Sequence, residues 1–89
     1  MRLFTDDGNL VLAYLYDKST LHDVEDLKHL LWFLNTNNCP KTVVGDWECK
    51  RTVDGGVYIE VIDTDIDMYI DDECILKRLV TSALASRAE

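Results

Sequence analysis

The chain has 89 residues, of which 47% are hydrophobic, and its 9 basic and 17 acidic side chains give a formal net charge of −8. The hydrophobic content is too high for a disordered chain, and the length suits one small domain, residues 1–89. Residues 1–44 hold four basic and six acidic residues, against five and eleven in residues 45–89. This acidity argues against direct binding to nucleic acid or to an anionic membrane, and it favours a basic partner protein.

The N-terminal segment and the cysteines predict a soluble, cytoplasmic protein. Asp6 and Asp7 interrupt the place where a secretory signal would be apolar, and no apolar run approaches the ~20 residues needed to cross a bilayer. Cys39, Cys49 and Cys74 show no CxxC spacing, so neither a disulfide framework nor a zinc knuckle is predicted.

The first predicted element is a β-hairpin. Leu3, Phe4 and Thr5 on one side and the apolar residues 10–16 on the other flank Asp7-Gly8, a pair that tolerates the positive φ angles of a tight turn. Residues 10–16 are apolar on both faces, which indicates a central strand covered on both sides or covered by a second copy of the chain. A helix is the competing interpretation, because Leu and Ala are good helix formers.

A helix is predicted over about residues 21–36. Ser19 and Thr20 are available as N-caps, acidic residues follow in the first turn, and Pro40 prevents continuation. The apolar stripe at helical spacing consists of Val24, Leu27, Leu30, Leu31 and Leu34.

A second hairpin is predicted on either side of the sequence Asp54-Gly55-Gly56, because the flanking segments alternate apolar and polar residues. A three-residue loop with Gly in the left-handed conformation fits best. This register places Lys50 opposite Glu60 on the outer face. On the inner face it pairs Val53 with Val57 and Cys49 with Val61.

After Ile62 the apolar pattern slips by one residue, so a bulge, bend or turn must lie near Asp63 and Thr64. Asp71 is then the predicted N-cap of a last helix. Each half of the chain thus resembles strand–turn–strand–helix. The predicted fold is α+β with ββαββα topology: a four-stranded, mostly antiparallel sheet with two helices on one face.

Residues 60–73 carry the candidate binding site, since this segment holds seven carboxylates and no basic residue. On a strand, Asp63, Asp65 and Asp67 would project from one face about 6.6 Å apart, close to the ~7 Å spacing of phosphates along a nucleic-acid strand. The alternative is a solvated edge that discourages strand pairing. The predicted partner-binding residues are Glu60, Asp63, Asp65, Asp67, Asp71, Asp72 and Glu73, with Tyr58 and Tyr69 as aromatic anchors.

Metal binding and catalysis have less support in the sequence. The acidic run lacks the Gly and Glu that an EF-hand loop needs at its sixth and twelfth positions. His22, Asp26 and His29 would share one helical face and could hold a divalent metal. No P-loop, GxSxG or GxGxxG motif is present. We therefore expect no cofactor and no catalysis, with a small divalent-metal-dependent enzyme as an alternative.

The sequence thus predicts a small, non-catalytic binding protein. Its acidic face would dock on the basic surface of a nucleic-acid-binding protein or nuclease, as a nucleic-acid mimic does. An inhibitor carried by a phage or another mobile element to disable a host nuclease fits this description. The other alternative is a structural interaction domain that forms a homodimer through residues 10–16.

Overall fold

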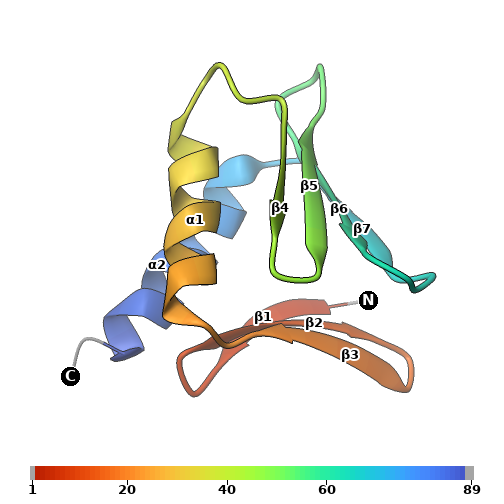
Figure 1. The fold of residues 1–89 in the computed structure, drawn as a ribbon, viewed down its shortest axis with the longest axis vertical. Helices are drawn as coiled ribbons and strands as arrows, with labels where there is room; N and C mark the ends of the chain where they lie inside the picture. The colour runs from red at the N-terminus through yellow and green to blue at the C-terminus, as the bar shows by residue number, and fades with distance from the viewer. Residues whose placement is uncertain (1, 88–89) are drawn as a thin grey trace.

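The computed structural model describes residues 2–87, which form an α+β fold of two antiparallel sheets and two helices (Figure 1). The first sheet comprises β1 (Arg2–Asp6), β2 (Asn9–Tyr14) and β3 (Asp17–Leu21), followed by α1 (Val24–Asn35). The second sheet comprises β4 (Lys41–Val44), β5 (Trp47–Arg51), β6 (Val57–Val61) and β7 (Asp67–Ile70), followed by α2 (Glu73–Arg87). The α+β class is as predicted, but the single four-stranded sheet of a ββαββα topology is not what the chain forms.

The strand that the sequence prediction lacks is β3. Ser19 and Thr20, predicted as helix caps, lie in β3 instead, and α1 begins later than expected. Asp23 is the N-cap of α1, with its carboxylate accepting a hydrogen bond from the backbone N–H of Glu25 at 2.9 Å. The strand was missed because its sequence is polar, and Leu21 is the one residue of β3 that is buried.

The first hairpin forms where Asp7-Gly8 predicted it. Asp6 pairs with Asn9, and the two turn residues have φ angles of 53° and 81°. A two-residue turn with positive φ at both central positions matches the twist of the paired strands. The Nε of Arg87 donates to the carbonyl of Gly8 at 2.5 Å, which fastens the end of α2 to this turn.

The β5–β6 hairpin has a three-residue loop as predicted, but the loop starts one residue earlier. Thr52 N donates to Gly56 O at 3.0 Å, and Thr52 Oγ1 accepts from Gly56 N at 2.9 Å. The loop is therefore residues 53–55, with Gly55 at a φ of 91°. The predicted pairing is wrong by two residues, and Lys50 lies opposite Tyr58. A shift of two leaves each side chain on its predicted face.

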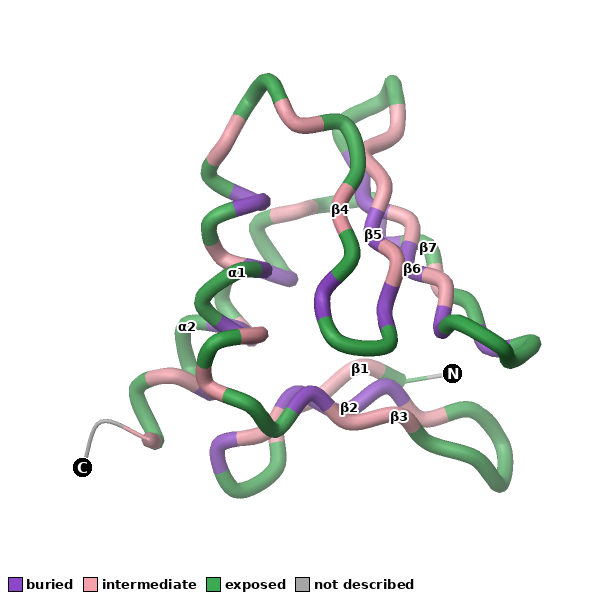
Figure 2. The backbone as a smooth tube through the Cα atoms, in the orientation of Figure 1, coloured by how far each residue is buried: buried purple, intermediate pink, exposed green. Residues whose placement is uncertain are grey.

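Both sheets and both helices contribute to one hydrophobic core. Trp47 and Phe33 are its largest fully buried side chains, and Trp47 Nε1 donates to Ser19 Oγ at 2.8 Å, which links the two sheets. Strand β2 is the centre of its sheet, and Leu10 and Leu12 lie in the core. The apolar strand is therefore covered within the chain itself. Figure 2 shows buried positions alternating with less buried ones along β5 and β6.

The two helices pack against each other on one side of the β4–β7 sheet (Figure 1). Helix α1 buries Phe33 in place of Leu31, which is only partly buried, while Trp32 remains 53% exposed. Within residues 2–87, neither helix combines the length and the apolar content that crossing a membrane requires.

Candidate functional site

The acidic residues gather on the four-stranded sheet. Residues 41–71 include eight acidic and three basic side chains, a net charge of −5, whereas residues 2–21 include three acidic and two basic ones, a net charge of −1. Of the three basic residues, Arg51 is turned inward, where it bonds to Glu73 and to the end of α1. The negative charge is thus displayed on one part of the molecule.

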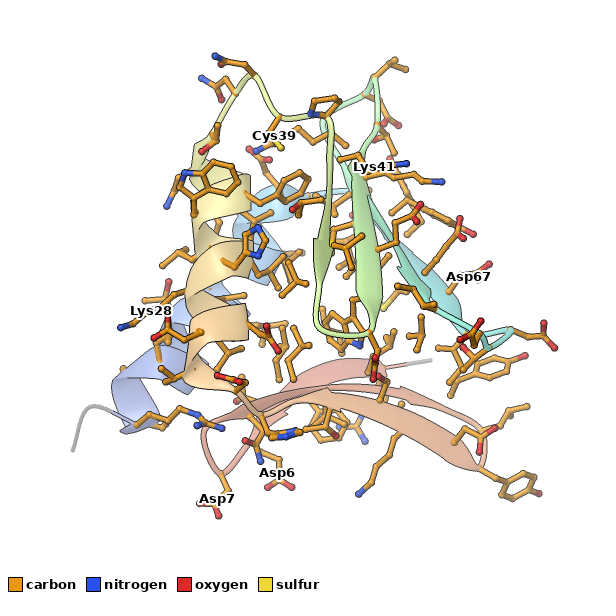
Figure 3. All side chains as sticks on the ribbon, in the orientation of Figure 1. Asp6, Asp7, Lys28, Cys39, Lys41 and Asp67 are labelled. Carbon is orange, nitrogen blue, oxygen red and sulfur yellow. The ribbon has the colours of Figure 1, made fainter. Side chains whose placement is uncertain are left out.

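The outer face of this sheet, meaning the side turned away from the helices, carries two rows of side chains. The first row runs across the strands as Val43, Glu48, Glu60 and Asp67. The second row is Lys41, Lys50, Tyr58 and Tyr69. Neighbouring strands are ~4.8 Å apart, so the three carboxylates of the first row, called the carboxylate row below, stand side by side. Figure 3 shows Asp67 projecting away from the helices.

Two neighbours compensate the repulsion within the carboxylate row, since like charges placed directly opposite each other are destabilising. Lys50 Nζ lies 3.1 Å from Glu48 Oε1 and 3.6 Å from Glu60 Oε1. The hydrogen bond to Glu48 and the charge of both carboxylates raise the pKa of Lys50. The hydroxyl of Tyr58 donates to Asp67 Oδ2 at 2.6 Å, and this bond raises the pKa of Tyr58 to about 12. The row is therefore ordered by its own neighbours while remaining net negative.

Tyr69 joins the outer face to the β5–β6 loop. Its hydroxyl donates to Asp54 Oδ2 at 2.7 Å, and Thr52 Oγ1 donates to Asp54 Oδ1 at 2.5 Å. These two bonds, with that from Thr52 the stronger influence, lower the pKa of Asp54. Tyr69 is 43% exposed, so part of its ring remains available to a partner.

The predicted strand through Asp63, Asp65 and Asp67 does not form. Strand β6 ends at Val61, Asp63 has a φ of 63°, and Thr64 Oγ1 donates to the carbonyl of Val61 at 2.9 Å. Thr64 Oγ1 also accepts from the backbone N–H two residues later at 3.0 Å. Asp63 and Asp65 therefore lie exposed in a turn, because Asp tolerates positive φ and the Thr hydroxyl closes the turn. Asp67 alone of the three stands in a strand.

The other predicted carboxylates lie at the start of α2. Asp71 was predicted to cap this helix, but Asp72 does so, and its Oδ1 accepts from the N–H of Cys74 at 2.9 Å. The side chain of Glu73 bonds to Arg51 at 2.5 Å. Asp72 and Glu73 thus have structural partners, whereas Asp71 is exposed between β7 and α2.

No group of three or more His, Cys, Asp or Glu side chains within residues 2–87 is placed to hold a metal ion. His22 precedes α1, which begins at Val24, so the predicted helical face of His22, Asp26 and His29 does not form. His29 Nε2 instead forms a hydrogen bond with Thr42 Oγ1 at 3.0 Å.

Glu48 and Asp54 belong to this acidic surface but were absent from the predicted site. Glu48 lies two residues before Lys50 and so shares its outer face, but the neighbours of Glu48 depend on the register. Asp54 is positioned by Thr52, whose side chain closes the loop. The sequence Thr-x-Asp-Gly was the available signal for this loop.

Comparisons with protein-family models, with curated proteins and with solved structures returned no match. The fold and the outer face together define a small α+β protein that presents an acidic, tyrosine-containing sheet surface.

Proposed function

We propose that this protein is a non-catalytic inhibitor that docks the outer face of the β4–β7 sheet on a basic surface of a partner protein. The partner is a nuclease or another nucleic-acid-binding protein, and the inhibitor has the character of a phage or mobile-element counter-defence protein. The observation that carries the proposal is the distribution of charge: −5 over residues 41–71 against −1 over residues 2–21.

A sheet surface suits the display of fixed negative charge. The carboxylate row is held at strand spacing, and the exposed Asp46, Asp63 and Asp65 extend the charge at one end of the sheet. A surface that binds phosphates through Lys and Arg would meet carboxylates here at comparable density. The carboxylates stand on paired strands, so the backbone loses little conformational entropy on binding. Their negative charge also accelerates the encounter with a basic partner.

Tyr58 and Tyr69 supply the contact area that charge alone does not. They are cross-strand neighbours on the outer face, next to the carboxylate row. Tyrosine is enriched at the energetic centres of protein interfaces, because its ring buries apolar surface while its hydroxyl keeps a polar partner.

The proposal is tested by capture from cell extract on the immobilised protein, with duplex DNA and then salt used for elution. We expect captured proteins to be displaced by DNA and released between about 50 and 200 mM salt, the range over which contacts to a polyanion weaken steeply. A second column that carries Glu48→Gln, Glu60→Gln and Asp67→Asn together should retain much less of the same proteins. Capture that DNA does not compete would show that the surface is not a nucleic-acid mimic.

A homodimer is the second candidate, and the turn between β2 and β3 is the observation that favours it. Leu15 and Tyr16 are 81% and 102% exposed at this tip, although the strand behind it is buried in the core. Light scattering at micromolar concentration distinguishes the candidates. A mass of twice the 10.2 kDa chain supports the dimer, and a monomeric mass rejects it.

A further inference from the structure

Strand β7 forms one edge of its sheet, with the order β4-β5-β6-β7. Val61 N donates to Ile66 O at 2.9 Å, and bonding residues alternate along an antiparallel pair. The carbonyl of Ile66 and the backbone groups of Met68 and Ile70 thus point towards β6. The backbone N–H and C=O groups of the intervening Asp67, Tyr69 and Asp71 point to the opposite edge. Within residues 2–87, no strand pairs with that edge.

A groove of about 280 Å³, lined by both apolar and polar side chains, runs beside this edge, between β7, β1 and the first turns of α2. Its apolar lining consists of Leu3, Met68, Ile70, Ile75 and Leu79. Asp71 and Tyr69 stand on the β7 side of the groove, and Arg2 stands on the β1 side. An unpaired strand edge next to a groove that accepts apolar side chains is the arrangement to which proteins add an extended peptide as a further strand.

We infer that an extended segment of the partner protein adds antiparallel to β7 as a fifth strand of this sheet. The segment alternates basic and apolar residues. Its apolar side chains enter the groove, and its basic side chains lie on the outer face beside Asp67, Tyr69 and Asp71. This inference deepens the proposed function and rests on it for the basic character of the partner.

The side chains that β7 presents on the outer face explain why basic and apolar residues alternate in the added segment. A strand added to β7 extends the row Glu48–Glu60–Asp67 by one residue, and a Lys or Arg there meets a carboxylate directly opposite. The next outward position extends the row that ends in Tyr69, where an Arg can stack on the exposed ring. Arg2 on the far side of the groove repels basic residues, so it confines them to the outer face.

The other edge of the sheet fits such a segment less well. Strand β4 carries Lys41 on its outer face, which would repel basic residues. It also lies beside α1, whereas the groove lies at β7. Charge and shape therefore select the same edge.

The test uses a synthetic, end-capped peptide, Lys-Val-Arg-Ile-Lys-Val-Arg, and measures its affinity by calorimetry and amide exchange by NMR. In antiparallel addition, the backbone of the basic residues bonds to β7. N-methylation of the basic residues should weaken binding about tenfold or more, whereas N-methylation of the apolar residues should change it less than about threefold. The amides of Tyr69 and Asp71 should exchange more slowly when the peptide is bound.

Protein variants separate this inference from the proposed function. Ile75→Lys places a charge in the groove at a residue that is 49% exposed, and it should weaken peptide binding about tenfold or more. The matched control is Val53→Lys, at a fully exposed residue away from the groove, which should leave affinity unchanged. An unmodified peptide that fails to bind, or equal affinity for both methylated peptides, overturns strand addition. DNA-competed capture of partners would still support the acidic docking face in that case.

Discussion

The guanidinium group of Arg51 donates from Nη1 to the carboxylate of Glu73 at 2.5 Å, so that β5 is joined to the first turn of α2. Its Nη2 donates to the carbonyls of Phe33, Leu34 and Thr36 at 2.6, 2.9 and 2.9 Å. These carbonyls lie at the end of α1, which has no basic residue in its last turn. Arg51 therefore supplies the positive charge that the end of α1 would otherwise lack.

Replacing this arginine should destabilise the fold more than any change on the outer face. We expect Arg51→Met to lower the free energy of unfolding by about 2–4 kcal/mol, because it leaves a carboxylate and several carbonyls without their donor. The matched control is Lys50→Met, one residue away on the exposed face, which should destabilise the fold much less because its ion pairs are open to solvent. Urea denaturation measures both, and equal effects would contradict the role given to Arg51.

Leu15 holds a strained turn. Its φ of 51° is unfavourable for a residue with a Cβ atom, and 81% exposure means that little packing compensates the strain. Leu15→Gly should raise the free energy of unfolding by about 0.5–1 kcal/mol. Tyr16→Gly, at the neighbouring position without positive φ, should lower it. A stabilising effect of both variants, or of neither, would show that strain is not the cause.

The hydrogen bond between Tyr58 and Asp67 can be tested by titration. Because this bond raises the pKa of Tyr58 to about 12, a ¹³C NMR titration of the tyrosine ring carbons should resolve Tyr58 near that value. Asp67→Ala should move the pKa of Tyr58 down towards 10.0, the value for an unperturbed tyrosine. Asp63→Ala, which changes an exposed carboxylate in the adjacent turn, is the control and should leave it unchanged. If Asp67→Ala left the pKa of Tyr58 unchanged, the hydrogen bond between Tyr58 and Asp67 would be contradicted.

The buried thiol of Cys49 should make the free energy of unfolding fall at alkaline pH. Burial, and to a lesser degree the charge of Glu48, raises the pKa of this thiol from 9.0 to about 12. The folded state therefore keeps its proton while the unfolded chain releases it, so the contribution to stability is complete below pH 9 and is lost as the pH rises towards 12. The cost approaches about 1.4 kcal/mol per pH unit.

Comparing wild type with Cys49→Ala isolates this contribution. The variant loses packing at every pH but no longer has a buried thiol, so the unfolding free energy of wild type minus that of the variant should fall by about 3 kcal/mol between pH 8 and pH 11. A constant difference over this range would mean that Cys49 ionises as freely in the folded protein as in the unfolded chain.

Local sequence signals predicted the first hairpin and both helices, because each depends on residues close together in the chain. Asp7-Gly8 produced the expected tight turn, and the helical apolar stripe placed α1 to within a few residues. Strand β3 could not be predicted in the same way. Its exposed, polar residues are ordered by pairing with β2, and Trp47 binds Ser19 from the other sheet. A local sequence pattern does not indicate either interaction, because both join β3 to residues of other strands.

The candidate surface was predicted in composition but not in arrangement. The density of carboxylates after residue 60 indicated an acidic surface, and the slip after Ile62 indicated a turn. The row of Glu48, Glu60 and Asp67 depends instead on the pairing register of three strands. The β5–β6 register accompanies the bonds of Thr52 to Gly56, and the β6–β7 register accompanies the bonds of Thr64 to Val61 and Ile66. Two turns, each closed by a threonine side chain, thus accompany the pairing that makes these carboxylates neighbours.

The most direct test of the docking proposal compares the affinity of two triple variants for a captured partner at about 50 mM salt. The first removes the carboxylate row through Glu48→Gln, Glu60→Gln and Asp67→Asn. The second removes three exposed carboxylates from the other sheet through Asp6→Asn, Asp7→Asn and Asp17→Asn. Both change the net charge equally. We predict an affinity loss of about 100-fold for the first variant and less than about threefold for the second. Equal losses would contradict a specific acidic docking face and leave only net charge.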